Sequence, residues 1–235
     1  MAREERRHSR VIERRKSIVL SAAFQLFASS SIEEVKMEDI AKKSEFGVAS
    51  LYRYYGTKTA LTIEVAETKW REFVDMLSKS EARNVPIDAN AAMELQHFLS
   101  VFQVLLHSHK DLAKFIVNFS SFLNHEKIPE SSLKGYRKAS EELLTFFKEH
   151  VYDKALNDGS VRTNLPLITT YRRIVVPCLS LAGRYAATLR FSIRGDFDGE
   201  AAYAFIIESI YHEMTSGLCT AKPLSPLKQR SSRHQ

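Results

Sequence analysis

The amino-acid sequence predicts an all-helical protein, and three observations carry this prediction. Glycine and proline are scarce, with 8 and 6 residues among 235, whereas a sheet-rich fold with many tight turns needs more of both. Apolar residues recur at steps of three, four and seven along most of the chain, which is the spacing of one helix face. No segment alternates apolar and polar residues for long enough to predict a strand.

The helices follow one another along the whole chain. Thr57 is a suitable N-cap for the longest of the early helices, on which Trp70 is expected to be half-exposed. The Asn157-Asp158-Gly159 segment is a C-cap signal. Pro177 falls inside a long predicted helix, where it frees the carbonyl of Arg173 and predicts a kink. The predicted helices span residues 11–27, 36–43, 48–55, 58–77, 89–107, 111–124, 131–157, 164–193 and 198–217.

The composition fits one large folded domain or two small ones. An apolar content of 44% and a charged content of 26% argue against wholesale disorder. No run of eighteen apolar residues predicts a membrane span, and the charged N-terminus does not resemble a secretory signal. The two cysteines, Cys178 and Cys219, are too few for a disulfide scaffold, and their partners cannot be deduced. We therefore expect a cytoplasmic protein with reduced thiols.

The net charge of +6 is concentrated in two segments. Residues 1–16 carry +4, residues 221–235 carry another +4, and the body between them carries −2. Basic arms often contact nucleic acid or acidic surfaces. For the tail at 221–235 a merely solubilising role is the favoured interpretation. The N-terminal arm leads directly into a helix, and contacts with the DNA backbone or minor groove remain open for it.

The short helices at 36–43 and 48–55 have the dimensions of a helix-turn-helix. In that unit the second helix enters the DNA major groove, and the first helix crosses the backbone. Leu51 and Tyr55 are predicted to face inward. The exposed side would offer small side chains to base edges and hydroxyls or cations to phosphates. The groove-facing candidates are Val48, Ala49, Ser50 and Arg53, and the phosphate candidates are Tyr52, Tyr54 and Lys58.

A longer motif, made of residues at fixed spacing, includes this unit and extends to both sides of it. It comprises Ala23, Leu26-Phe27, Asp39-Ile40-Ala41 and the run Ser50-Leu51-Tyr52-Arg53-Tyr54-Tyr55-Gly56-Thr57-Lys58-Thr59-Ala60-Leu61. In these residues the segment from Arg14 to Leu61 resembles the DNA-binding domain of TetR-family transcriptional repressors. The resemblance implies the same phosphate-contacting and groove-facing roles for the candidates above.

The sequence departs from the family pattern at three positions. Ser31 and Glu45 stand where the family usually has glycine, so a left-handed backbone at Glu45 is expected to carry modest strain. Lys36 stands at a family threonine and adds a fourth candidate for a phosphate contact.

The resemblance further implies that the helices after the DNA-binding domain bind an effector and form a dimer. We expect a DNA-binding domain at 1–57, an effector-binding and dimerisation domain at 58–220, and a basic tail at 221–235. Most aromatic residues of the second domain are expected to be core, and a fraction to line a pocket near the predicted kink. The pocket candidates are Phe98, Phe102, Phe115, Phe119, Phe122, Phe146, Phe147, Tyr171 and Cys178.

Small residues recur at helical spacing in the last two helices. They allow close helix approach, as a two-fold interface requires, although packing within one subunit explains the pattern equally well. The dimer-interface candidates are Ala182, Gly183, Ala186, Ala187, Ala201, Ala202, Phe205 and Ser209.

The sequence therefore predicts a homodimeric, ligand-responsive repressor that binds a palindromic DNA operator. The alternative is a DNA-binding protein of the same fold that acts through a protein partner. An enzyme is disfavoured because no catalytic constellation is visible. No cofactor is expected, and the spacing of His97, His107, His109 and His125 does not favour a metal.

Overall fold

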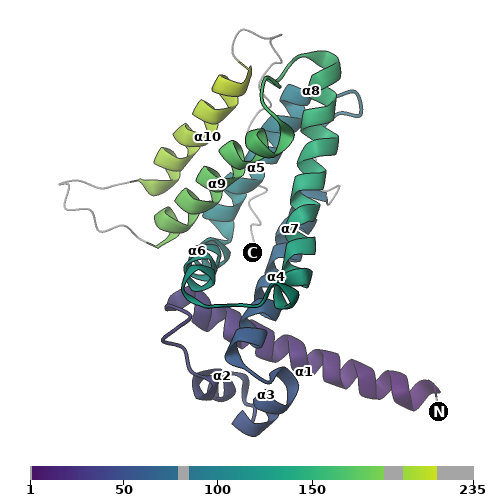
Figure 1. Cartoon of the computed structure of the whole chain (residues 1–235), viewed down its shortest axis with the longest axis vertical. Helices are drawn as coiled ribbons and strands as arrows, with labels where there is room; N and C mark the ends of the chain where they lie inside the picture. Colours follow the sequence, from purple (N-terminus) through teal and green to yellow (C-terminus); the bar gives the residue numbers. More distant parts are fainter. Residues whose placement is uncertain (1, 79–84, 188–197, 216–235) are drawn as a thin grey trace, which may run out of the picture.

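All regular elements in the described part of the chain are helices, as the sequence predicts (Figure 1). The computed structural model describes residues 2–78, 85–187 and 198–215. The basic tail at 221–235, Cys219, and the predicted helix ends at 193 and 217 lie outside these residues. Within the described ranges, no helix is long and apolar enough to cross a membrane.

Three helices form an N-terminal unit at the lower end of the molecule in Figure 1. They are α1 (Ala2–Ser29), α2 (Met37–Ser44) and α3 (Val48–Tyr55). Each helix turns one apolar stripe towards the other two, so the unit has its own small core. The inward positions predicted for Leu51 and Tyr55 are confirmed. The core includes Val19, Ala23, Phe27, Ile32, Ile40, Leu51 and Tyr55.

Helix α1 begins earlier than the sequence predicted. The apolar pattern starts at Val11, but the helix starts at Ala2. The added turns are rich in arginine and glutamate, which are good helix formers even without an apolar stripe to bury. Figure 1 shows this part of α1 projecting away from the other helices. The N-terminal arm is therefore a continuation of the first helix.

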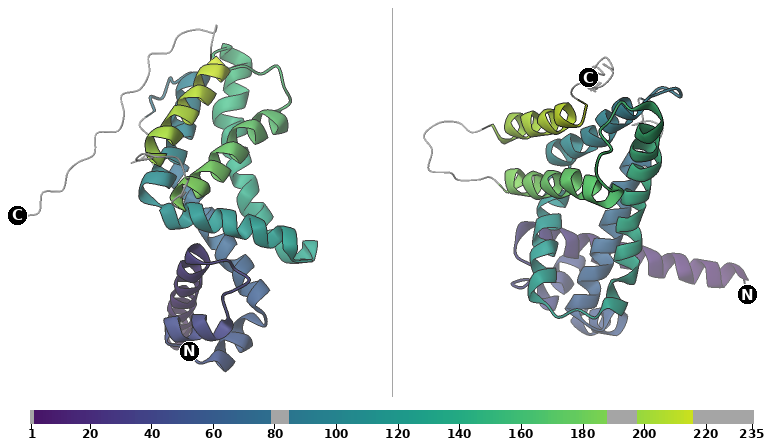
Figure 2. Two further views of the ribbon diagram at one scale, coloured as in Figure 1. Left: turned by 90° about the vertical axis from the view of Figure 1, so that its left-hand side faces the viewer. Right: turned by 45° about the horizontal axis from the view of Figure 1, so that its top comes forward.

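The other helices form a bundle above the N-terminal unit (Figures 1 and 2). Helix α4 leads out of the unit into the bundle and packs along α7, while α9 and α10 lie together at the opposite side. Helix α6 packs on both α9 and α1. The bundle comprises α4 (Lys58–Ser78), α5 (Ala91–Ser108), α6 (Lys110–His125), α7 (Lys134–Phe147), α8 (Asp153–Asp158), α9 (Leu167–Ala186) and α10 (Gly199–Thr215).

The helix predicted at 131–157 is divided in the structure. A 3₁₀ turn, η1 (Glu130–Leu133), precedes α7, and a π-helical turn, η2 (Lys148–Tyr152), separates α7 from α8. The predicted C-cap is confirmed, because Gly159 has a φ of 67° and its N–H donates to Ala155 O. Glycine adopts this left-handed backbone without a steric cost.

Aromatic rings fill the centre of the bundle. The Phe98 ring lies 5.4 Å from the Phe102 ring and 5.2 Å from the Phe147 ring, measured between centroids. Phe102 in turn contacts Phe73 of α4 at 5.7 Å. All four side chains are fully buried. These phenylalanines therefore join α4, α5 and α7 into one core, to which each ring pair adds roughly 0.5–1.5 kcal/mol beyond area burial.

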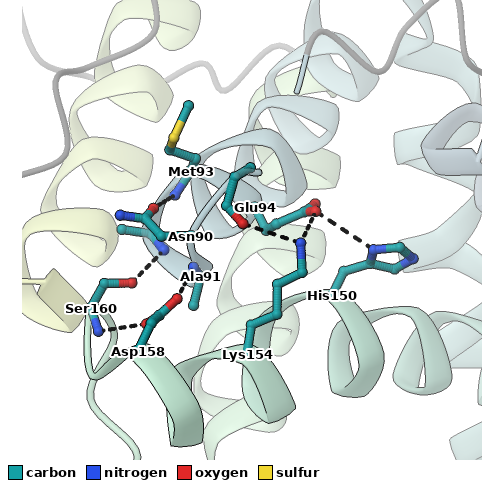
Figure 3. A network of polar contacts seen from close by, with 10 residues as sticks. Asn90, Ala91, Met93, Glu94, His150, Lys154, Asp158 and Ser160 are labelled. Atoms are coloured by element: carbon teal, nitrogen blue, oxygen red, sulfur yellow. Dashed lines mark hydrogen bonds and ion pairs between the residues drawn. The ribbon is translucent and has the colours of Figure 1, made fainter. Parts of the chain in front are cut away.

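A polar network fixes the N-terminus of α5 (Figure 3). The first backbone N–H groups of α5 donate to Asp158, Ser160 and Asn90, at distances of 2.7–3.0 Å. These acceptors satisfy donors that a helix start leaves open, and two of them come from α8 and the loop after it. Nearby, the buried Glu94 carboxylate accepts a hydrogen bond of 2.7 Å from Lys154 Nζ. The network therefore joins α5 to α8.

The small residues of α9 pack within the subunit, which corrects part of the predicted dimer interface. Ala182, Gly183 and Ala186 are buried. A Cβ at Gly183 would lie 2.1 Å from Val117 Cγ2 and 2.7 Å from the Ala113 carbonyl oxygen, both in α6. The glycine thus permits the close contact of α9 with α6. The other candidates, Ala187, Ala201, Ala202, Phe205 and Ser209, are exposed or half-exposed.

Candidate nucleic-acid interface

A short turn without a left-handed glycine joins α2 to α3. Glu45 has φ 58° and ψ 34°, so it adopts the left-handed backbone that only glycine takes freely. The Phe46 N–H donates to Ala41 O and the Glu45 N–H donates to Lys42 O, so α2 ends in a Schellman motif. Glu45 is the only non-glycine residue with a positive φ in the described ranges. Ser31 therefore replaces its family glycine without strain.

Helix α3 separates a buried side from an exposed side. Leu51 is completely buried, whereas Tyr52 and Tyr54 are 47% and 40% exposed. Arg53 is also exposed, and its guanidinium lies 5.4 Å from the Tyr54 ring centroid. At the start of the helix Ala49 is exposed, and Val48 and Ser50 are half-exposed. Ala49, Ser50, Tyr52, Arg53 and Tyr54 are therefore accessible on the outer side of α3, whereas Val48 packs partly against the core beside Leu51.

The buried Tyr55 side chain holds α3 in one orientation about its helix axis. Burial, with a smaller contribution from the Glu64 carboxylate, raises the pKa of Tyr55 to about 12. The phenol thus stays neutral at physiological pH, and its ring belongs to the hydrophobic core, with Lys16 Nζ of α1 at 6.0 Å from the ring centroid. Rotating α3 to expose another side would bring this ring into water, so packing sets which residues face outward.

Lys36 and Lys58 were both predicted to contact phosphates, and the structure separates them. Lys36 precedes α2 and is exposed. The Lys58 ammonium donates to the carbonyl oxygens of Ile32, Glu33 and Val35, at 2.8, 3.0 and 3.0 Å. An ammonium has three N–H donors, so in this structure all of them are used. Lys58 holds the loop between α1 and α2 against the start of α4 and has no donor left for phosphate.

Helix α6 contacts the end of α1 and so attaches the DNA-binding unit to the bundle. The sequence did not predict this contact. The Asn118 side-chain amide donates to Phe27 O at 2.8 Å and to Ser30 O at 3.0 Å, at the end of α1. One turn earlier, the Phe115 ring packs edge-on against Phe24 at 5.5 Å. Asn118 satisfies terminal carbonyls that α1 otherwise leaves open. A movement of α6 is therefore transmitted directly to α1.

Helix α4 holds the other side of α1. Lys69 Nζ lies 4.5 Å from the Phe24 ring centroid, and Lys16 pairs with Glu64 at 3.1 Å. Exposed pairs of this kind contribute little to stability on their own. They accompany the packing of α1 against α4. The DNA-binding unit is thus attached to both α4 and α6.

A small hollow lies in the bundle next to this junction. It measures about 10 Å³, enough for about one water molecule. Trp70 lines it and is 7% exposed, not half-exposed as predicted. Its indole N–H has no hydrogen-bond partner among the described residues. The other lining residues come from α4, α6 and α7 and are Ala66, Lys69, Leu112, Phe115, Ile116, Phe119 and Tyr136.

Of the nine predicted pocket residues, Phe115 and Phe119 line this hollow. Phe98, Phe102, Phe122, Phe146, Phe147 and Tyr171 belong to the packed aromatic core or its edge. The hollow is also away from Pro177, which lies inside α9. Trp70 and Tyr136 were missed because a residue at the edge of an apolar stripe gives no sequence signal for lining a hollow.

Cys178 is fully buried beside α10. Burial raises the pKa of its thiol to about 12, so it is protonated at physiological pH. The Tyr203 hydroxyl donates to the Cys178 carbonyl oxygen at 2.8 Å. A redox sensor needs an accessible thiolate, so the surroundings of Cys178 favour a packing role.

Two of the four histidines considered as metal ligands make separate local contacts. His107 lies 2.7 Å from Glu200 of α10, and His125 contacts the Ser121 carbonyl. Hydrogen bonds from His107 and Lys110 hold the pKa of Glu200 below its usual value. Among the described residues, no group of three potential ligands is arranged to hold a metal ion.

The helix-turn-helix unit, carried on a separate helical bundle, places the chain in the class of helix-turn-helix proteins. Residues 19–65 match the family model described as "Bacterial regulatory proteins, tetR family". Residues 19–65 are therefore similar to the DNA-binding region of TetR-family regulators, the resemblance that the sequence predicted. A search of curated proteins by sequence found no match.

Solved structures with the same fold include three transcriptional regulators. FadR from Bacillus subtilis, in complex with stearoyl-CoA, is 16% identical, with 86% of this chain and 99% of that chain covered and a TM-score of 0.62. MbdR from Azoarcus sp. CIB is 13% identical, with 88% and 100% covered and a TM-score of 0.62. The ketosteroid regulator KstR2 of Mycobacterium tuberculosis is 18% identical, with 86% and 95% covered and a TM-score of 0.55. These likenesses establish the fold of the chain.

The different surroundings of Lys36 and Lys58 lead to opposite expectations for two matched variants. Lys58→Met removes three hydrogen bonds and should lower the free energy of unfolding by about 1–2 kcal/mol. Lys36→Met should leave stability within about 0.5 kcal/mol and weaken duplex binding. Urea denaturation followed by circular dichroism, together with binding titrations, measures both effects. A fully stable Lys58→Met protein that binds DNA poorly would restore the phosphate role of Lys58.

Proposed function

We propose that the protein is a cytoplasmic, homodimeric transcriptional repressor that binds a palindromic operator and responds to a small molecule. The observation that carries this proposal is the α2–α3 unit, whose inner side is locked by Leu51 and Tyr55 and whose outer side offers polar and cationic groups. Residues 1–57 would bind DNA, and residues 58–220 would bind the effector and form the dimer.

Within the DNA-binding domain, the roles follow from position on α3. Val48, Ala49, Ser50 and Arg53 would face the base edges of the major groove. Tyr52, Tyr54 and Lys36 would donate to phosphates at its rim. Phosphate contacts set the register and affinity, while base contacts set sequence preference. These two groups of residues are therefore expected to respond differently to substitution.

The outer side of α9 and α10 would form the dimer interface. Phe205 is 70% exposed and Val176 is 55% exposed, although both are large apolar side chains. Together with the exposed Ala187, Ala201 and Ser209 they offer a surface that a second copy would cover. A two-fold arrangement of this kind places two α3 helices about 34–36 Å apart, one turn of DNA.

The hollow at Trp70 would be the effector site in a closed form. Phe115 lines it on one side and contacts Phe24 of α1 on the other. A ligand that enlarged the hollow would therefore push α6 and change the position of α1. The FadR structure, which holds stearoyl-CoA, shows that this fold can hold a ligand. In this chain the lining favours a ligand with an aromatic or apolar body and an acceptor for the Trp70 N–H.

A second candidate function is favoured by the small volume of the hollow. With room for about one water molecule, the hollow at Trp70 does not hold an effector without opening, while apolar side chains such as Phe205 remain exposed. This combination fits a DNA-binding protein that acts through a protein partner rather than an effector. A screen of small molecules against the protein distinguishes the two functions.

The DNA-binding proposal is tested by selection of duplexes from a random library at low salt. The full chain should enrich a palindrome with half-sites about 10 base pairs apart. Ser50→Ala and Arg53→Ala should change the enriched sequence, whereas Tyr52→Phe should weaken binding to all duplexes alike. If no sequence is enriched, the proposal is wrong. Uniform weakening by Arg53→Ala would reassign that side chain to phosphate.

The effector proposal is tested through Trp70, which is the only tryptophan of the chain. A compound that binds the hollow should change its fluorescence and alter operator affinity. Trp70→Phe keeps an aromatic ring but removes the N–H donor, so it should weaken such a compound about tenfold by calorimetry. The matched variant Tyr211→Phe, outside the hollow, should have no effect. If compounds that control DNA binding leave Trp70 fluorescence unchanged and bind the Trp70→Phe variant as tightly as the wild type, the effector site lies elsewhere.

A further inference from the structure

The N-terminal turns of α1 place arginines along one side of the helix. Arg3, Arg6, Arg7, Arg10 and Arg14 follow the i, i+3, i+4, i+7, i+11 spacing. At 3.6 residues per turn these positions fall within an arc of about 100°. The three acidic residues of the same segment lie outside this arc. Because the backbone is helical from Ala2, the five positions form one continuous arginine stripe.

Arg14, the one position of the stripe whose side chain the structure describes, is exposed. Among the side chains described from Ile12 onward, the first buried one in α1 is Val19. The stripe is also on the side of α1 opposite to Val19 and Ala23, by the same helical spacing. In Figure 1 this part of the helix projects at the end of the molecule that holds α2 and α3. A partner that reaches α3 is therefore close to the stripe.

The chemistry of the segment favours DNA over a membrane or an acidic protein. A helix that lies in a membrane surface needs several large apolar residues opposite its cations, but here that side carries Glu5, His8 and Arg15 with a single large apolar residue, Ile12. Regularly spaced arginines match the regular array of phosphates along a duplex, where each guanidinium can bind two oxygens. The stripe is also part of the same helix that supports α3, so one duplex can meet both.

We propose that the arginine stripe lies along the sugar–phosphate backbone of the DNA that flanks the operator. This inference rests on the proposed DNA-binding function and extends it to a second contact surface. From Arg3 to Arg14 the helix rises about 16 Å, equal to about five base pairs. Each protomer of a dimer then adds about five base pairs to its own end of the site. These contacts carry charge but no base recognition, so they raise affinity without changing the preferred sequence.

The test compares two lengths of the duplex that the full chain enriches in selection. One duplex is trimmed to the palindrome, and the other carries eight further base pairs of arbitrary sequence on each side. The test variant is Arg3→Ala/Arg6→Ala/Arg7→Ala/Arg10→Ala, in which alanine preserves helix propensity. The charge-matched control is Lys222→Ala/Lys228→Ala/Arg230→Ala/Arg233→Ala, in the tail outside the described residues. Circular dichroism and thermal unfolding check that both variants fold.

The wild-type chain should bind the flanked duplex about tenfold tighter than the trimmed one at low salt. The arginine variant should bind both lengths equally and keep the same sequence preference. The slope of log K against log salt concentration should become shallower by about 0.9 for each phosphate that the variant no longer neutralises. The tail control should keep the length dependence of the wild type.

Three results would overturn the inference. They are equal weakening of the arginine variant on both lengths, an unchanged length dependence in that variant, and an equal effect in the tail control. A wild-type chain that enriches a palindrome but binds both lengths equally overturns only this inference. A chain that enriches no sequence overturns the proposed function as well.

Discussion

The attachment of α1 to α6 is the constraint on which the rest of the molecule depends. The Asn118 amide binds two terminal carbonyls of α1, and Phe115 packs on Phe24 one turn away. Lys58 fixes the start of α4 to the loop that follows α1. The outer side of α3 is useful only if α1 holds it in a defined direction. These contacts therefore connect the local packing of the DNA-binding unit to the arrangement of the whole bundle.

Helix α6 also connects the interior to the proposed dimer side, since it packs tightly on α9. Gly183 has no room for a side chain between Val117 and the Ala113 carbonyl, so α6 and α9 cannot slide apart without opening a gap between them. A ligand that enlarged the hollow at Trp70 by displacing α6 would therefore move α6 towards α1 or move α9 with it. In a dimer joined through α9 and α10, either movement changes the relation between the two α3 helices, provided that the ligand prefers one arrangement.

The sequence predicted the helix-turn-helix and its inward residues Leu51 and Tyr55, because both depend on local spacing. It left the geometry of the turn at Glu45 open, because a missing glycine signals a departure but not how the backbone accommodates it. It did not predict the use of Lys58, since a lysine that binds phosphate and one that binds carbonyls look alike in a motif. It placed Gly183 in a dimer interface because small residues signal close packing but not the identity of the partner helix. Asn118 and Trp70 gave no signal, since their roles arise from contacts between distant helices.

The central claim is that α6 holds the DNA-binding unit in place, and hydrogen exchange in an Asn118→Ala variant tests it most directly. Amides of α2 and α3 should exchange faster than in the wild type, because the end of α1 loses two hydrogen bonds. Amides of α5 and α7 should be unchanged. Asn124→Ala, on an exposed position of the same helix, should behave as the wild type. Unchanged exchange in α2 and α3 of the Asn118→Ala protein would contradict the account.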